Sequence, residues 1–120
     1  MSKGSLYERL GGEGKIRQVV TSIYDNHANN KTVSARFAKS DKNQLIQHIT
    51  AFVCAGTGGP QTYAGKDMIS AHKGMNIGGQ EYLAVIDDIM GALNAHGVGK
   101  REQEEFLMIA YSLKGDILHV

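Results

Sequence analysis

Residues 41–72 are the most informative part of this chain and read DKNQLIQHITAFVCAGTGGPQTYAGKDMISAH. Residues 41–55 predict an amphipathic helix, because their apolar side chains recur at the i, i+3/i+4, i+7 spacing of one helix face. Asp41, with Gln44 three residues later, resembles a capping box at the start of this helix. The predicted buried face consists of Leu45, His48, Ile49, Phe52 and Val53.

The second half of this stretch predicts a loop and a short helix. Gly58-Gly59-Pro60 indicates a helix end, since proline commonly follows one. Residues 56–65 are rich in glycine and are predicted to be irregular, and a long loop in a small domain often has a functional reason. A short helical piece is expected near 66–72.

Helical periodicity continues on both sides of this stretch. It predicts further long helices over 13–29, 80–96 and 100–118, and shorter pieces near 5–10 and 31–37. In the first of these the apolar stripe consists of Ile16, Val19, Val20, Ile23, Tyr24 and His27. No segment of useful length alternates with period two. We therefore predict an all-α fold with residues 1–120 forming one domain.

Composition narrows the class of protein. Thirteen Lys and Arg residues against 12 Asp and Glu residues give a net charge of +1, which disfavours nucleic acid as a partner. No apolar run approaches the roughly 18 residues of a membrane span. The first ten residues lack the apolar core of a signal peptide, and Cys54 is alone, so we expect a cytoplasmic protein without an internal disulfide. Cys54 is interpreted as a small buried hydrophobe.

Several residues could carry chemistry, although the sequence holds no CxxC, HExxH, P-loop or GxSxG motif. His48 lies on the apolar stripe of its helix, where an imidazole is either a hydrogen-bonded core residue or a ligand. His72 ends a short helix and is either solvated or a ligand. A buried Tyr24 hydroxyl needs a partner, which can be protein, water or a bound molecule. The remaining histidines, toward helix or chain ends, are expected to be solvated: His27, His96 and His119.

Taken in order along the chain, short pieces of sequence form a recognisable pattern. They are Ser5-Leu6-Tyr7-Glu8-Arg9-Leu10-Gly11-Gly12, Ile23-Tyr24, Arg36-Phe37-Ala38, Ala51-Phe52, Gly58-Gly59-Pro60, Tyr63-Ala64-Gly65-Lys66-Asp67-Met68, Ala71-His72 and Gly97-Val98. With these pieces at matching separations, the chain resembles the group I truncated haemoglobins over almost its whole length. The resemblance implies a two-over-two helical sandwich, a shortened globin fold, around one haem b.

The resemblance also implies roles for individual residues. His72 matches the proximal iron ligand, whose second ring N–H needs an acceptor. Tyr24 matches the distal tyrosine, whose hydroxyl can donate to bound O₂. The positions that match haem contacts are Phe37, Phe52 and Met68, and those that can reach a propionate are Lys66 and Tyr63.

The predicted distal helix departs from the family pattern. Many members carry a glutamine at the position of Leu45 or of Ile49, and both are apolar here. Tyr24 is then expected to be the only protein donor inside the pocket. His48 lies between these two residues, where some members place a histidine that binds iron as the sixth ligand. Such ligation would lower the apparent ligand affinity by the fraction of open state.

Three functional hypotheses follow. The first is reversible binding of O₂, with NO and CO as further ligands, by a monomer; NO oxidation to nitrate would need an external reductase. The second is a bis-histidine haem protein, ligated by His48 and His72, for electron transfer or ligand sensing. The third is a helical interaction module without a cofactor, whose apolar stripes close completely on one another.

Overall fold

The described part of the computed structural model comprises residues 4–38, 40–61, 63, 75 and 77–118. Its elements are α1 (Leu6–Arg9), α2 (Gly12–Asn29), the 3-10 helix η1 (Ser34–Phe37), α3 (Lys42–Gly56), α5 (Gly79–Ala95), α6 (Lys100–Ser112) and α7 (Lys114–Ile117). Within these ranges, β-type pairing is limited to one isolated bridge between Ile77 and Leu118. The predicted all-α class is confirmed. The short helix expected near 66–72 lies outside the described residues.

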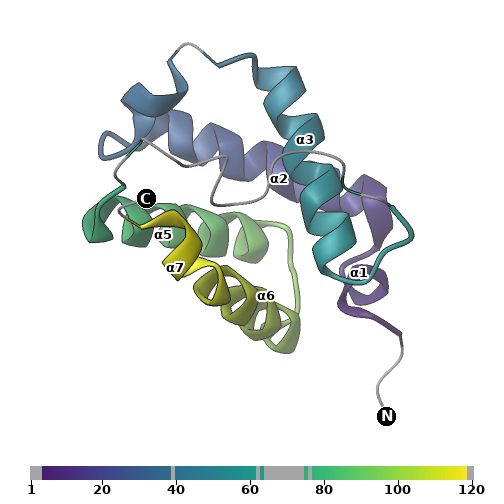
Figure 1. The fold of residues 1–120 in the computed structure, drawn as a ribbon. Helices are drawn as coiled ribbons and strands as arrows, with labels where there is room; N and C mark the ends of the chain where they lie inside the picture. The colour runs from purple at the N-terminus through teal and green to yellow at the C-terminus, as the bar shows by residue number, and fades with distance from the viewer. Residues whose placement is uncertain (1–3, 39, 62, 64–74, 76, 119–120) are drawn as a thin grey trace.

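The helices form two layers, each built from two long helices (Figure 1). In one layer α2 crosses α3, and in the other α5 lies beside α6. Helix α2 is central, because it contacts α3, α5 and η1. This arrangement is the two-over-two sandwich that the resemblance to the group I truncated haemoglobins implied.

The buried face of α2 is the one that its periodicity predicted. All six residues of the predicted stripe are buried, and Val20 is only 1% exposed. Burying an aliphatic side chain of this size contributes about 1.5–3 kcal/mol each, so this face is a main source of stability. Helix α2 contacts α3 in its own layer and α5 in the second layer.

The predicted buried face of α3 needs a correction. The buried residues are Ile46, Thr50 and Cys54, and the predicted stripe lies to one side of them. His48 is exposed, because at about 100° per residue it lies on the opposite side of the helix from Thr50. The small side chains of Thr50 and Cys54 face the core and leave room for a close neighbour, whereas apolar periodicity favours the larger residues.

The ends of α3 agree with their sequence signals. The Asp41 side chain accepts a hydrogen bond from the Gln44 amide at 3.1 Å, as an N-cap does. After the helix ends, the chain passes very close to α1. A Cβ added at Gly59 would lie 2.6 Å from Cδ1 of Tyr7 and 2.8 Å from the Cys54 carbonyl oxygen. Only glycine fits at this crossing.

The last predicted helix, 100–118, is divided in two. Helix α6 ends at Ser112 and α7 begins at Lys114, with Leu113 as the residue between them. Gly115 lies in this region and weakens helix formation by about 1 kcal/mol relative to alanine, and Leu118 leaves the helix to form the bridge with Ile77. Tertiary pairing here overrides a continuous apolar pattern.

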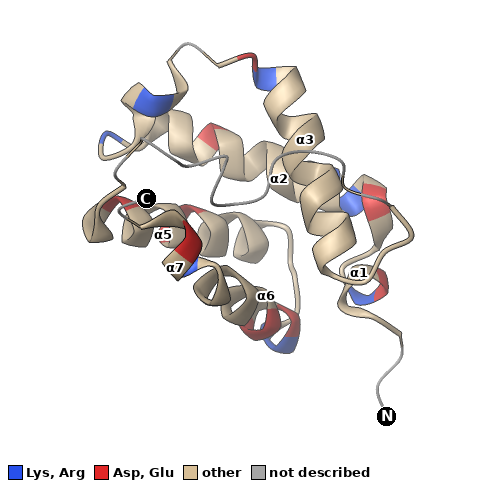
Figure 2. Cartoon of the chain, in the orientation of Figure 1, with Lys and Arg blue, Asp and Glu red and all other residues tan. Residues whose placement is uncertain are grey.

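Charged residues of both signs are distributed along the helices, and both occur at the start of α6 (Figure 2). Arg9 of α1 reaches α6 and forms ion pairs of 2.9 Å with Glu102 and 2.7 Å with Glu105. Hydrogen bonding from Arg9 lowers the pKa of Glu105. Among the described helices, we find none that has the length and apolar character to cross a membrane.

Candidate functional site

Tyr24 projects from the middle of α2 into a nearly closed environment. Its side chain is 7% exposed, and its hydroxyl oxygen lies 2.7 Å from the hydroxyl oxygen of Ser40. Ser40, which precedes α3, donates its own hydroxyl proton to the Phe37 carbonyl oxygen at 2.8 Å. Three residues from α2, η1 and the following loop therefore form one polar chain. No sequence pattern indicated a role for Ser40, because a single loop serine belongs to no periodic pattern.

The Tyr24 ring is held by contacts on several sides. Phe37 meets it edge to face, with ring centroids 5.6 Å apart and planes inclined at 75°. The Lys42 ammonium lies 5.8 Å from the Tyr24 centroid and is itself paired with Asp25 at 2.9 Å. These contacts fix the ring, so the position of the hydroxyl is defined by the fold.

A buried histidine supports this aromatic cluster. His27 is 6% exposed and stacks on Phe37 at 5.2 Å between centroids. Its Nδ1 lies 2.7 Å from Asp88 of α5, which also accepts from the Asn30 amide at 3.1 Å. The expectation that His27 is solvated was wrong. Its place on the predicted apolar stripe of α2 was the available signal that His27 is buried. No sequence pattern distinguished its partner Asp88 from the neighbouring Asp87.

The remaining described candidates lie along one side of α3. Leu45, Ile49 and Phe52 are half-buried, and the first two pack against the core. Phe52 meets Tyr63 edge to face at 5.1 Å and 79°. His48 lies at the margin of this row with an exposed side chain. The structure thus brings Tyr24 and Phe37 together, and separately Phe52 and Tyr63.

Three of the predicted site residues, Lys66, Met68 and His72, lie outside the described residues. The chain that follows them is anchored by Arg36 of η1. Its guanidinium donates to the Met75 carbonyl oxygen at 3.1 Å and to Glu81 of α5 at 3.0 Å. This hydrogen bonding lowers the pKa of the Glu81 carboxyl. Arg36 therefore links the turn that carries Phe37 to the segment that follows His72 in sequence.

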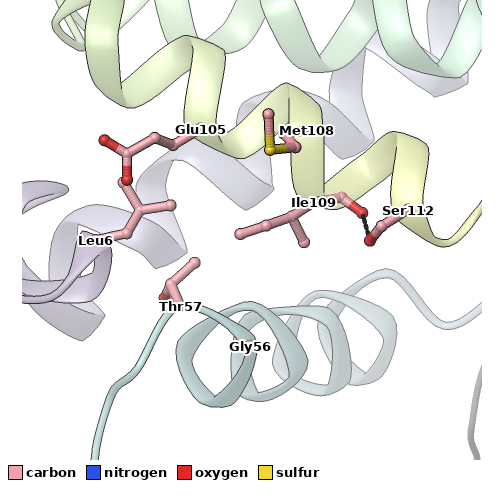
Figure 3. Close-up of a pocket in the computed structure, with 7 residues that line it drawn as sticks. All are labelled: Leu6, Gly56, Thr57, Glu105, Met108, Ile109 and Ser112. Atoms are coloured by element: carbon pink, nitrogen blue, oxygen red, sulfur yellow. Dashed lines mark hydrogen bonds between the residues drawn. The ribbon is translucent and has the colours of Figure 1, made fainter.

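A separate groove of about 310 Å³ lies between α1, the end of α3 and α6 (Figure 3). Leu6, Thr57 and Ile109 face one another across it, and Met108 lies on its α6 wall. The described residues that line it include none of the residues predicted for the site. The candidate site is therefore the region of Tyr24, Phe37 and the α3 row.

Comparison with known proteins decides the family. A family model described as bacterial-like globin matches residues 5–119. A group 1 truncated haemoglobin from Tetrahymena pyriformis is 30% identical over 114 residues, which cover 95% of this chain and 94% of that protein. The chain belongs to the bacterial-like globin family, among the group 1 truncated haemoglobins. The globin is also 28% identical over 115 residues to the group 1 truncated haemoglobin GlbN of Nostoc sp., covering 96% and 98% of the two chains.

Solved structures agree with this assignment. The ferric truncated haemoglobin of Tetrahymena pyriformis superposes with a TM-score of 0.93 at 29% identity, covering 98% of this globin and all of that chain. The 2/2 haemoglobin of Synechococcus sp. PCC 7002 shares the fold at a TM-score of 0.89 and 24% identity, covering 96% and 98%. Family membership makes this globin a haem protein that binds diatomic ligands. It decides against a helical module without a cofactor.

The residues present fit a haem. A haem offers two broad apolar faces, and the α3 row offers half-buried apolar side chains that the described part of the fold leaves partly uncovered. Tyr24 lies on α2, in the same helical layer as α3, and adds one buried hydroxyl. Ser40 contacts this hydroxyl, and Phe37 packs against the ring that carries it. When bound, haem supplies an iron with a coordination position for a diatomic ligand.

Proposed function

We propose that this globin binds O₂ reversibly on a haem b held by His72, with Tyr24 as the hydrogen-bond donor to the ligand. The observation that supports this role is the buried Tyr24 hydroxyl, fixed by an aromatic contact and by Ser40. A hydroxyl in a dry pocket interacts more strongly with a partly negative ligand than it would in water. Phe37, Phe52 and Met68 are proposed to contact the haem, and Lys66 and Tyr63 to approach its propionates.

The side of α3 proposed to face the haem carries little polarity. Leu45 and Ile49 offer no hydrogen bond to a ligand or to Tyr24. A single donor stabilises a bound ligand less than a network of donors. We therefore propose moderate retention of O₂, with release that is fast enough for exchange.

We further propose that the ferrous iron is five-coordinate, with His48 outside the coordination sphere. The exposed position of His48, at the margin of the α3 row, supports this proposal. Binding of His48 to the iron would require α3 to turn about its own axis, which would disturb the packing of Ile46 and Cys54. The bis-histidine alternative is thereby the less favoured one.

NO and CO are proposed as further ligands of the same site, because both are small and diatomic. The globin match spans residues 5–119, so no flavin or nicotinamide domain accompanies it within those residues. An external reductase is proposed to support any repeated oxidation of NO. We propose a monomer as the acting unit.

The decisive experiment is the visible spectrum of the purified protein reduced with dithionite under argon. A Soret band with one broad visible band is expected, which indicates five-coordinate iron. A sharp, split visible pair that disappears in His48→Leu would replace our proposal with the bis-histidine one. Failure of added haem to give any Soret band would contradict haem binding itself.

A further inference from the structure

The further inference concerns the direction of the hydrogen bond between Tyr24 and Ser40, and it rests on the proposed role of Tyr24. Ser40 has one hydroxyl proton. The Phe37 carbonyl oxygen can only accept, and it lies 2.8 Å from Ser40 Oγ, so that proton is directed to Phe37. Two hydroxyl oxygens 2.7 Å apart need one proton between them. That proton must come from Tyr24.

The Tyr24 proton is thus already in use before a ligand arrives. For Tyr24 to donate to a ligand, its O–H must turn away from Ser40. The Ser40 hydroxyl can then turn and donate to the Tyr24 oxygen, but it loses its bond to Phe37. The Phe37 carbonyl keeps one partner, since the Ser40 amide also donates to it at 3.2 Å. Ligand stabilisation therefore always requires the loss of one existing hydrogen bond.

We infer that Ser40 is a positioning residue that competes with the ligand for the Tyr24 proton and thereby lowers the O₂ affinity of this globin. It does so without touching the ligand. The half-buried position of Ser40 shields this bond from water, so the exchange takes place between protein groups. With apolar Leu45 and Ile49 on α3, the Ser40 hydroxyl is the partner that the described structure gives to the Tyr24 hydroxyl.

The first test is Ser40→Ala. Removing the competing acceptor leaves Tyr24 with an unsatisfied hydroxyl in the free state, so the variant is expected to bind O₂ roughly twofold to tenfold more tightly, the size of one neutral hydrogen bond. Ser40→Thr keeps the hydroxyl and is expected to restore the original affinity. An unchanged or lower affinity in Ser40→Ala would overturn the inference.

Ser112→Ala is a matched control. Ser112 donates to the Ile109 carbonyl oxygen at 2.6 Å, the same local bond that Ser40 makes to Phe37, but its side chain is exposed on α6. Its removal is expected to leave O₂ affinity unchanged. An equal gain in both variants would show that the effect comes from loss of a local serine bond, and the inference would fail.

A double-mutant cycle separates competition from a general structural effect. In a Tyr24→Phe background there is no proton to compete for, so Ser40→Ala is expected to change O₂ affinity by less than twofold. A gain that persists without the tyrosine hydroxyl would overturn the inference. Two other results would contradict the proposed function itself. One is an original protein that binds no O₂, and the other is a Tyr24→Phe variant whose O₂ affinity and dissociation rate are unchanged.

A spectroscopic readout tests the donor direction without measuring O₂. In the CO complex, a proton donated toward the ligand lowers the C–O stretching frequency. Ser40→Ala is expected to lower this frequency relative to the original protein, while Ser112→Ala leaves it in place. In the original protein's CO complex, an NMR cross-peak is expected between the Tyr24 hydroxyl proton and the Ser40 β-protons. A frequency that rises in Ser40→Ala would contradict the assigned direction.

Discussion

His27 and Asp88 are 61 positions apart in the sequence, yet the imidazole Nδ1 lies 2.7 Å from the carboxylate and joins the two helical layers. An ionised carboxylate can only accept, so Nδ1 carries the proton. Three side chains converge on Asp88. His27 of α2 and Asn30, the residue after α2, contact its carboxylate, and Asn26 of α2 donates to its carbonyl oxygen at 3.0 Å. This residue therefore fixes the crossing of α2 and α5.

Asp88→Ala is expected to lower the free energy of unfolding by about 1.5–3 kcal/mol, because two bonds to a carboxylate are lost and His27 stays buried without a partner. Urea unfolding of the haem-loaded protein measures this. Asp87→Ala, at an exposed neighbouring position, is the control and is expected to change stability by less than about 0.5 kcal/mol. Equal losses in the two variants would contradict the role of the buried pair.

Tyr24→Phe is expected to accelerate O₂ dissociation roughly tenfold to a hundredfold, because the hydrogen bond to a charged ligand is lost. Stopped-flow replacement of O₂ by CO gives the rate. Tyr111→Phe, at an exposed position on α6, is expected to dissociate O₂ at the original rate. An unchanged rate in Tyr24→Phe would remove this residue from the ligand site.

His72→Ala is expected to lose most of its haem affinity, because the proposed iron ligand is absent. Haem transfer to an excess of an apo-globin acceptor measures the change. His48→Leu is expected to hold haem like the original protein and to keep the same ferrous spectrum. Retention of haem by His72→Ala with an unaltered spectrum would assign the proximal ligand elsewhere.

The Arg36–Glu81 ion pair predicts a dependence of stability on pH. Arg36 lowers the pKa of Glu81 below its unfolded value of 4.5. The pair therefore stabilises the fold above pH 4.5, and this contribution is lost as the pH falls through the lowered pKa. Glu81→Gln is expected to cost about 0.5–1 kcal/mol at pH 7, within the range for partly exposed pairs, and nothing below that lowered pKa.

Unfolding in urea at neutral and acid pH tests this dependence. Glu104→Gln, at an exposed position on α6, is the control and is expected to match the original protein at both pH values. A loss in Glu81→Gln that is the same at neutral and acid pH would show that the charge of Glu81 contributes nothing.

Cys54 is expected to be inert toward thiol reagents in the native protein. Its side chain is fully buried, and burial raises the pKa of its thiol. A chromogenic disulfide reagent is expected to titrate one thiol in urea and almost none without it. Rapid labelling under native conditions would mean that α3 separates readily from the core.

Sequence reasoning succeeded where one helix face contacts the core through large apolar residues, as in α2. On α3 it was correct in part: Cys54 is buried as expected, and Leu45 and Ile49 pack against the core. It missed Ile46 and Thr50 as buried residues, and it wrongly placed His48 on the buried face. It could not find Asp88 or Ser40, whose roles depend on partners in other elements. The resemblance supplied the role of Tyr24, whereas its hydrogen-bond partner came only from the fold.

The close crossing at Gly59 restricts how this globin can diverge. Even alanine would place a methyl group 2.8 Å from a backbone oxygen, and that oxygen belongs to a rigid helix end and cannot move aside as a flexible side chain could. In a saturation library selected for bound haem, codon 59 is thus expected to return glycine alone, while the nearby exposed codon 60 accepts a wider set of residues. The close crossing between α1 and the end of α3 therefore makes position 59 intolerant of substitution.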